Sequence, residues 1–228
     1  VRTATATPTP EPTPTQTPRP SWVSSFIDPV MTTVENEEPE FFDNFSIPDA
    51  NWGFRDGNRP ALSPITIENE MLVMAISRDY GFARERKLSI NNFVENLDFA
   101  FAQDDQSVFE LVLVGSYGSW SVHLINTGEA WEGTIKVQDP KTGDWKPVQN
   151  GVVSAEDPTK MNLTVIKNGT QLAVLVDGHP MLTYQDRALP KTMFHDYYFY
   201  RGTTDVMVKM TLDNIRIWDL DNYPNLPK

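Results

Sequence analysis

Cysteine is absent from the 228 residues, and basic residues are few. Without cysteine the chain can form no disulfide bond, no thiolate nucleophile and no cysteine-ligated metal site. The 19 Lys and Arg residues are outnumbered by 31 Asp and Glu residues, which gives a formal net charge of −12. A protein that binds nucleic acid or an anionic membrane needs a basic surface, so neither is expected as a partner.

Long apolar runs and several catalytic motifs are also missing. No apolar stretch approaches the ~20 residues that a membrane-spanning helix requires. The histidines His123, His179 and His195 are far apart and lack the spacing of metal ligands or of a catalytic triad. No Gly-x-Ser-x-Gly elbow for a serine nucleophile occurs. We therefore expect structural roles for the histidines, no bound metal and no cofactor.

Threonine and proline dominate the first twenty residues, which contain seven threonines and six prolines. Proline fixes the backbone and removes hydrogen-bond donors, so this segment is predicted to be an extended, polyproline-like stalk. Thr/Pro tracts of this kind often carry O-linked sugar and space domains outside a cell. The sequence thus predicts an extracellular or cell-surface location and O-glycosylation at Thr3, Thr5, Thr7, Thr9, Thr13, Thr15 and Thr17.

An apolar arm and an acidic linker follow the stalk, over residues 21–40. Apolar side chains recur there at helical spacing, although Pro29 interrupts the pattern. Two interpretations remain open: the arm lies along its own domain as a strap, or it inserts into a neighbouring copy of the chain. The residues that would make the contact are Trp22, Val23, Phe26, Ile27, Val30 and Met31.

From residue 41 onward the sequence is typical of β-strands, with β-branched and aromatic runs separated by turn residues. For example, two alternating runs, 162–167 and 171–176, flank Asn168-Gly169-Thr170, a turn sequence that tolerates positive φ. Many antiparallel strands with short turns and no credible helix predict an all-β, two-sheet jelly-roll sandwich over residues 41–228, preceded by an extended N-terminal tail.

Four segments, taken in order, resemble the concanavalin A-like or laminin-G-like jelly-roll domains of secreted microbial proteins. Residues 41–46 with Trp52 resemble the opening strand of that family, and residues 67–72 resemble its first hairpin, with Glu70 in place of the usual glycine. Residues 161–178 resemble a later hairpin that ends in Asp-Gly, and residues 212–217 match the closing strand. The resemblance implies the fold for the whole globular part, but it does not imply one activity, because the family includes lectins, hydrolases and structural domains.

The retaining glucanases of this fold carry a Glu-x-Asp-x-x-Glu strand, which supplies a nucleophile and an acid. That motif does not occur here, since Asp104, Asp105, Glu110, Glu129 and Glu132 have other spacings. The sequence therefore favours a protein that is not an enzyme.

Exposed aromatic rings are the natural candidates for sugar binding, because the apolar faces of sugars stack on them. The candidates are Tyr117, Trp120, Trp131 and Trp145, all in or beside the central strands and turns.

The leading hypothesis is a non-catalytic extracellular structural protein, a glycosylated fibre or sheath subunit that assembles with copies of itself through its N-terminal arm. The alternative is a carbohydrate-binding module displayed on the same stalk, whose partner is a glycan.

Overall fold

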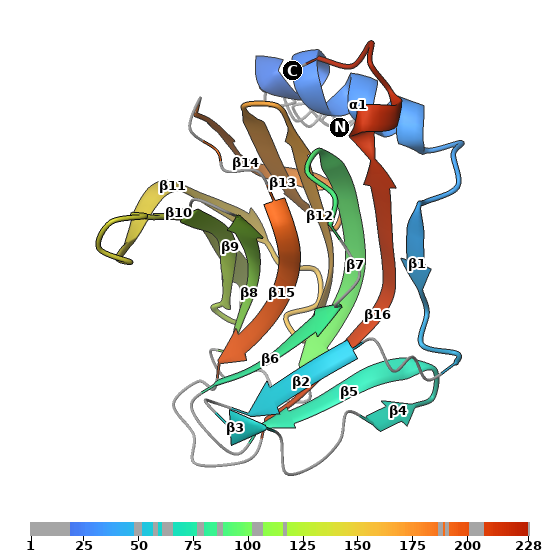
Figure 1. The fold of residues 1–228 in the computed structure, drawn as a ribbon, viewed down its shortest axis with the longest axis vertical. Helices are drawn as coiled ribbons and strands as arrows, with labels where there is room; N and C mark the ends of the chain where they lie inside the picture. The colour runs from blue at the N-terminus through green and yellow to red at the C-terminus, as the bar shows by residue number, and fades with distance from the viewer. Residues whose placement is uncertain are drawn as a thin grey trace, which may run out of the picture.

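Two antiparallel β-sheets stack face to face in the computed structural model, which confirms the predicted jelly-roll sandwich (Figure 1). The structure describes residues 19–47, 52–56, 59–60, 66–76, 80–85, 89–101, 107–115, 118–186, 189, 192–200 and 208–227. The predicted O-glycosylation sites and Tyr117 lie outside these residues. In the described part no helix is long and apolar enough to cross a membrane.

The first sheet has the strand order β14-β13-β12-β7-β16-β5-β4, with β1 also paired to β16. The closing strand β16 thus lies near the centre of this sheet and pairs with β1, β5 and β7. The bounds are β1 Phe41–Asp43, β4 Thr66–Glu68, β5 Met71–Ile76, β7 Phe93–Phe101, β12 Lys160–Asn168, β13 Gln171–Val176, β14 His179–Gln185 and β16 Val208–Asp219.

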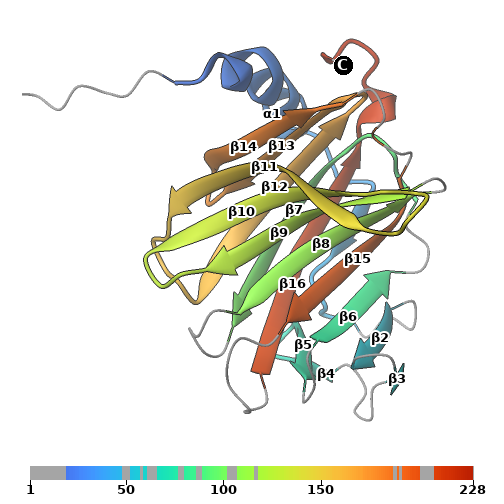
Figure 2. The ribbon, with the colours of Figure 1, turned by 90° about the vertical axis from the view of Figure 1, so that its left-hand side faces the viewer.

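The second sheet has the order β11-β10-β9-β8-β15-β6-β2-β3. Its strands β8, β9 and β15 curve so that the outer face of the sheet is concave, and the β10–β11 hairpin projects outward beside that face (Figures 1 and 2). The bounds are β2 Trp52–Asp56, β3 Arg59–Pro60, β6 Tyr80–Glu85, β8 Val108–Gly115, β9 Gly118–Asn126, β10 Ala130–Gln138, β11 Trp145–Ser154 and β15 Thr192–Tyr200.

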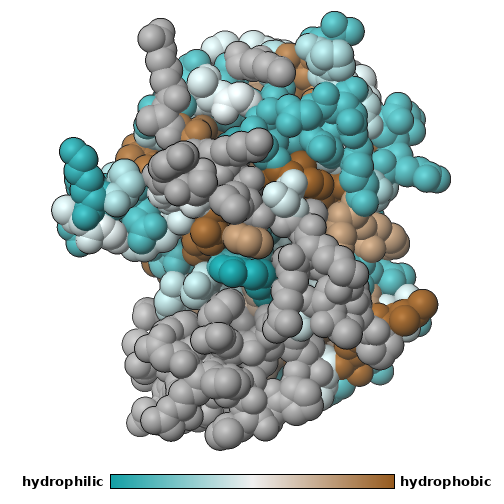
Figure 3. Space-filling view, in the orientation of Figure 1, coloured by the Kyte–Doolittle hydropathy of each residue, from teal (hydrophilic) through white to brown (hydrophobic). Residues whose placement is uncertain are grey.

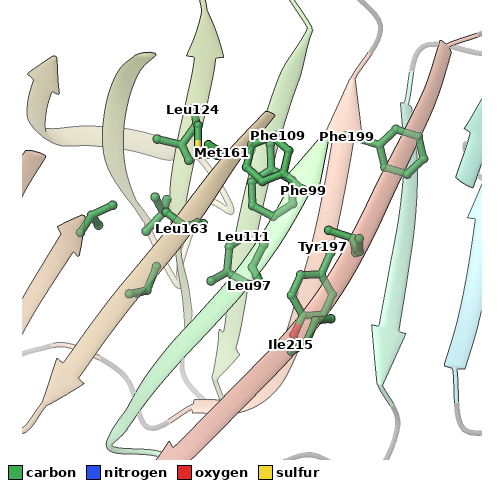
Figure 4. Close-up of a cluster of buried hydrophobic side chains, with 14 of the residues drawn as sticks. Leu97, Phe99, Phe109, Leu111, Leu124, Met161, Leu163, Tyr197, Phe199 and Ile215 are labelled. Carbon is green, nitrogen blue, oxygen red and sulfur yellow. The ribbon is translucent and has the colours of Figure 1, made fainter. Parts of the chain in front are cut away.

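The core fills the space between the sheets, because alternate residues of each strand point inward. Phe99 of β7 stacks on Phe109 of β8 with ring centroids 4.4 Å apart, and Leu97, Leu111 and Tyr197 surround them (Figure 4). A buried pair also joins the two sheets: Nδ1 of His195 lies 2.8 Å from Oε2 of Glu95, and both side chains are fully buried.

The N-terminal arm folds as a helical strap over the outer face of the first sheet. A short π-helical turn, η1 (Val23–Ile27), continues into α1 (Asp28–Val34), and Pro29 is the second residue of α1, just after the wider turn. The buried strap residues Val23, Phe26, Ile27, Val30 and Val34 pack on Val94, Ile166, Ala173, Leu175 and Leu220. Hydrophilic side chains cover much of the upper part of the molecule, where α1 and the C-terminal segment lie (Figure 3).

The linker after the strap is tied to the end of β16. The indole Nε1 of Trp218 donates to the carbonyl of Glu37 at 2.9 Å, and Glu40 accepts from the backbone N–H of Asp219 and from Asn222. Of the two interpretations of the arm, the structure shows the strap on its own domain. The arm residues proposed for assembly are therefore used inside the chain.

Candidate functional site

The concave outer face of the second sheet gathers polar and aromatic side chains from four strands. On β8, Phe109, Leu111 and Leu113 point into the core, so Glu110 and Val112 point outward. The same alternation on the neighbouring strands turns Ser121, His123, Lys136, Asp196, Tyr198 and Tyr200 to this face.

The strand register places these residues in rows across the sheet. Glu110 of β8 lies directly opposite His123 of β9 on one side and opposite Tyr198 of β15 on the other. Lys136 of β10 lies opposite Ser121 of β9, one step along the face. Because paired residues of an antiparallel sheet share a face, residues distant in the sequence meet here.

Glu110 is the centre of this arrangement. Its Oε1 accepts a hydrogen bond from Oγ of Ser121 at 2.6 Å and lies 3.4 Å from Nζ of Lys136. Its Oε2 accepts from the hydroxyl of Tyr200 at 2.7 Å. The Nδ1 atom of His123 is 3.6 Å from Oε1. Four donor side chains from three neighbouring strands thus surround one carboxylate.

The environment keeps Glu110 ionised. Burial alone would raise its pKa, but the nearby imidazole of His123, hydrogen bonds from Ser121 and Tyr200, and the charge of Lys136 together lower the pKa to about 2. A carboxylate with so low a pKa cannot act as a general acid near neutral pH. It can stabilise positive charge that develops on a sugar ring, and it fixes the side chains around it.

A second carboxylate, Asp196, lies on the same face beside Glu110 but has a different partner. The guanidinium of Arg84, on β6, donates to both oxygens of Asp196, which is 1% exposed. The hydrogen bond to Asp196 raises the pKa of Arg84, against the opposing effect of burial. Arg84 also lies over the ring of Phe194, 4.8 Å from its centroid. This carboxylate is therefore ion-paired and serves to hold Arg84 on the aromatic ring.

Aromatic rings flank the polar centre. The rings of Tyr198 and Tyr200 are nearly parallel, with centroids 6.3 Å apart, and the imidazole of His123 lies 6.3 Å from the Tyr200 ring. Partly exposed rings next to charged and hydroxyl groups suit a sugar polymer, which offers apolar faces and hydroxyls together. In the described residues no group of three or more His, Asp or Glu side chains is arranged to hold a metal ion.

Two of the four predicted sugar-binding aromatics are placed wrongly by the sequence reasoning. Trp120 and Trp131 point into the core and are 0% exposed, so no sugar can stack on them. Both occupy the inward phase of their strands, as Val122 and Ile135 do. Trp145 is 38% exposed and lies opposite Gln138 on the concave side of the β10–β11 hairpin, where it remains a candidate.

Sequence reasoning missed the centre of the site because no local motif marks it. It noted Glu110 only as a carboxylate outside the glucanase spacing, and it expected a structural role for His123. The available signal is the alternation of inward and outward positions along each strand. Polar side chains occupy the outward positions between inward apolar residues; they are Glu110, Ser121, His123 and Lys136.

Comparison with known proteins gives a fold but no family. No protein-family model matches the chain, and no curated protein matches its sequence. Solved structures do match. One is the kappa-carrageenase from Pseudoalteromonas carrageenovora in complex with an oligotetrasaccharide of kappa-carrageenan, with a TM-score of 0.61 and 13% identity over 78% of this chain and 92% of that one.

Two further matches have related activities. A non-specific endo-beta-1,3(4)-glucanase of family GH16 has a TM-score of 0.61 and 12% identity, and covers 79% of this chain and 90% of its own. The Crh5 transglycosylase has a TM-score of 0.60 and 12% identity, and the match covers 78% of this chain and 83% of the transglycosylase chain. At these identities the likeness establishes the fold.

These matches correct two predictions. The leading hypothesis, a non-catalytic fibre or sheath subunit, is wrong, because the three solved structures described above, which share this fold, are enzymes that cleave or transfer carbohydrate. The prediction that the chain is not an enzyme is contradicted by the same finding. That prediction rested on the absence of Glu-x-Asp-x-x-Glu. The absence excludes one arrangement of catalytic carboxylates, but it does not exclude other proton donors on the concave face.

Proposed function

We propose that this chain is a carbohydrate-active protein that binds an extended glycan across the concave face of the second sheet and acts on it there. The observation that carries the proposal is the cluster around Glu110, in which an ionised carboxylate, an imidazole, an ammonium group and two tyrosine rings line one concave surface. The fold shared with carbohydrate-cleaving enzymes supports it.

Glycosidic cleavage requires a proton for the departing oxygen. Among the described side chains of this face, we assign this role to the imidazole of His123, which lies 3.6 Å from Oε1 of the ionised Glu110. After His123 protonates the glycosidic oxygen and the bond to the anomeric carbon breaks, water adds to that carbon and returns a proton to the imidazole. The negative charge of Glu110 stabilises the cationic sugar in between.

The first experiment measures retention and cleavage together. The full chain is run through gels that contain a panel of soluble polysaccharides, and new reducing ends are counted after incubation. We expect retention by at least one glycan, with cleavage of the same glycan. Tyr198→Ala should weaken retention on the order of tenfold through lost ring contact, whereas Phe42→Ala, an exposed ring on the other sheet, should not.

A second variant separates binding from turnover. His123→Gln keeps a polar side chain at the site but carries no exchangeable charge, so it should retain glycan and lose cleavage. Absence of retention by every glycan in the panel would refute the proposal. Retention without new reducing ends in the wild type would refute its catalytic part.

An extracellular location and a glycosylated stalk belong to the same proposal. The Thr/Pro tract supports both, because such segments often carry O-linked sugar and space domains outside a cell. Intact mass spectrometry of the protein from its native host should show hexose increments on a peptide from residues 1–20. An unmodified peptide would contradict the predicted O-glycosylation.

A further inference from the structure

We infer that the glycan taken by the concave face is uncharged, and that sulfated or carboxylated polymers are rejected. The inference rests on the proposed function and adds the substrate class. It follows from how the charged side chains of the face are paired.

Each described cation of this face already has a carboxylate partner. Arg84 donates to both oxygens of Asp196. Lys136 lies 3.4 Å from Glu110, and His123 lies 3.6 Å from the same oxygen. A sulfate group that approached Arg84 or Lys136 would either meet the repulsion of the neighbouring carboxylate or have to displace that carboxylate from a position fixed by the sheet register. Displacement would leave a buried carboxylate, Asp196 or Glu110, without its partner, which is costly.

The remaining charge of the face is negative. Glu132 of β10 is exposed and lies opposite Ile125 and Val152, both of which point outward. With it, the described side chains of the face contribute three carboxylates, Glu110, Glu132 and Asp196, against the two permanent cations Arg84 and Lys136. The chain as a whole, with this face included, carries a formal net charge of −12. An anionic polymer is therefore repelled at long range and finds no unpaired cation among the described side chains of this face.

The uncharged groups of the face fit a neutral sugar. Thr134 and Gln138 flank Lys136 on the same side of β10, and Ser121 lies opposite Lys136 on the neighbouring strand β9. The rings of Tyr198, Tyr200 and Trp145 offer apolar contact. Hydroxyls and apolar ring faces are what an unsubstituted pyranose presents.

The test uses one polymer in two charge states. Native kappa-carrageenan and the same polymer after chemical desulfation are compared in affinity electrophoresis, together with a neutral mixed-linkage glucan. We expect the full chain to be retained by a neutral polymer and at least about tenfold less by the sulfated one. Retention should change little with added salt, because screening acts on charge attraction.

A charge-reversal variant gives a gain of function. Glu132→Lys places an unpaired cation on the face, so it should increase retention by sulfated carrageenan, and salt should abolish the increase. Glu35→Lys, the same change at the end of the strap on the other sheet, is the matched control and should have no such effect.

The outcomes distinguish the inference from the proposed function. Retention by the sulfated polymer equal to or stronger than by its desulfated form overturns the inference and leaves the proposed function standing. Retention by neither neutral nor charged polymers overturns the proposed function itself. Equal retention of Glu132→Lys and Glu35→Lys on the sulfated polymer also overturns the inference, because it would place binding elsewhere.

Discussion

Replacing the buried Lys167 by methionine should stabilise the protein near neutral pH. Lys167 of β12 is 1% exposed, and its Nζ donates to the carbonyl oxygen and to Oδ1 of Asn91 at 2.9 and 3.0 Å. Burial lowers the pKa of Lys167 from 10.5 to about 8, with Asp221 acting weakly against this. Burying the charged ammonium of Lys167 therefore lowers the free energy of unfolding, and replacing it by an uncharged side chain removes this penalty.

The size of the effect follows from the pKa. Each pKa unit corresponds to about 1.4 kcal/mol, so keeping Lys167 charged in the folded state costs about 3 kcal/mol below pH 8. Methionine has a similar length and fills the same space. Loss of the two hydrogen bonds to Asn91 offsets part of the gain, at roughly 1 kcal/mol. We expect a net stabilisation of about 2 kcal/mol near neutral pH.

The pH dependence identifies the cause. Between about pH 8 and pH 10.5 the unfolded chain holds a proton on Lys167 that the folded chain lacks, so wild-type stability rises with pH in that window. The advantage of Lys167→Met should therefore shrink above pH 8 and vanish near pH 10.5. Urea unfolding followed by tryptophan fluorescence at about pH 7 and about pH 10 measures this.

The control is Lys160→Met on the same strand, where the lysine is exposed and forms a surface ion pair with Asp157. That change should alter stability by less than about 0.5 kcal/mol. The reasoning is refuted if Lys167→Met is less stable than wild type near pH 7, or if a stabilisation persists unchanged near pH 10.

Three other perturbations follow from the structure. Glu110→Gln should remove about 3 kcal/mol of stability that the wild type holds above pH 4.5 and loses as pH falls toward about 2, so acid unfolding curves of the two proteins should converge at low pH. Phe26→Ala empties the strap contact and should cost about 3 kcal/mol in urea unfolding; a cost under about 1 kcal/mol would mean that the strap is weakly attached. Gly151→Ala should lower the melting temperature sharply, because its Cβ would lie 2.5 Å from the carbonyl oxygen of Met181, whereas Gly143→Ala, in open space at φ +79°, should cost only about 1 kcal/mol.

The sequence predicted the fold well because strand signals are local. The runs on either side of Asn168-Gly169-Thr170 became β12 and β13, with Gly169 at φ +59° in the turn. The alternation of apolar and polar residues along a strand indicated which of its two faces is apolar. The resemblance to jelly-roll domains then supplied the topology that local patterns do not encode.

The site could not be predicted in the same way, because the sheet register builds it. Glu110 and Tyr200 are ninety positions apart, yet their side chains are 2.7 Å apart. Residue type alone misled the choice of tryptophans, since a tryptophan on an inward strand position is core whatever its affinity for sugars. Sorting the candidate site residues by inward and outward strand position would have excluded Trp120 and Trp131 and included Glu110 and His123.

The position of the strap has a mechanical consequence. The strap and the C-terminal residues Leu220, Tyr223 and Leu226 pack on each other at one end of the sandwich. A pull on the N-terminal side would therefore peel the strap from the sheet turn by turn, while β16 stays clamped between β5 and β7. In a force measurement that loads the chain from its N-terminus, the strap should detach first at low force, and the concave face should keep its shape until the sandwich itself ruptures.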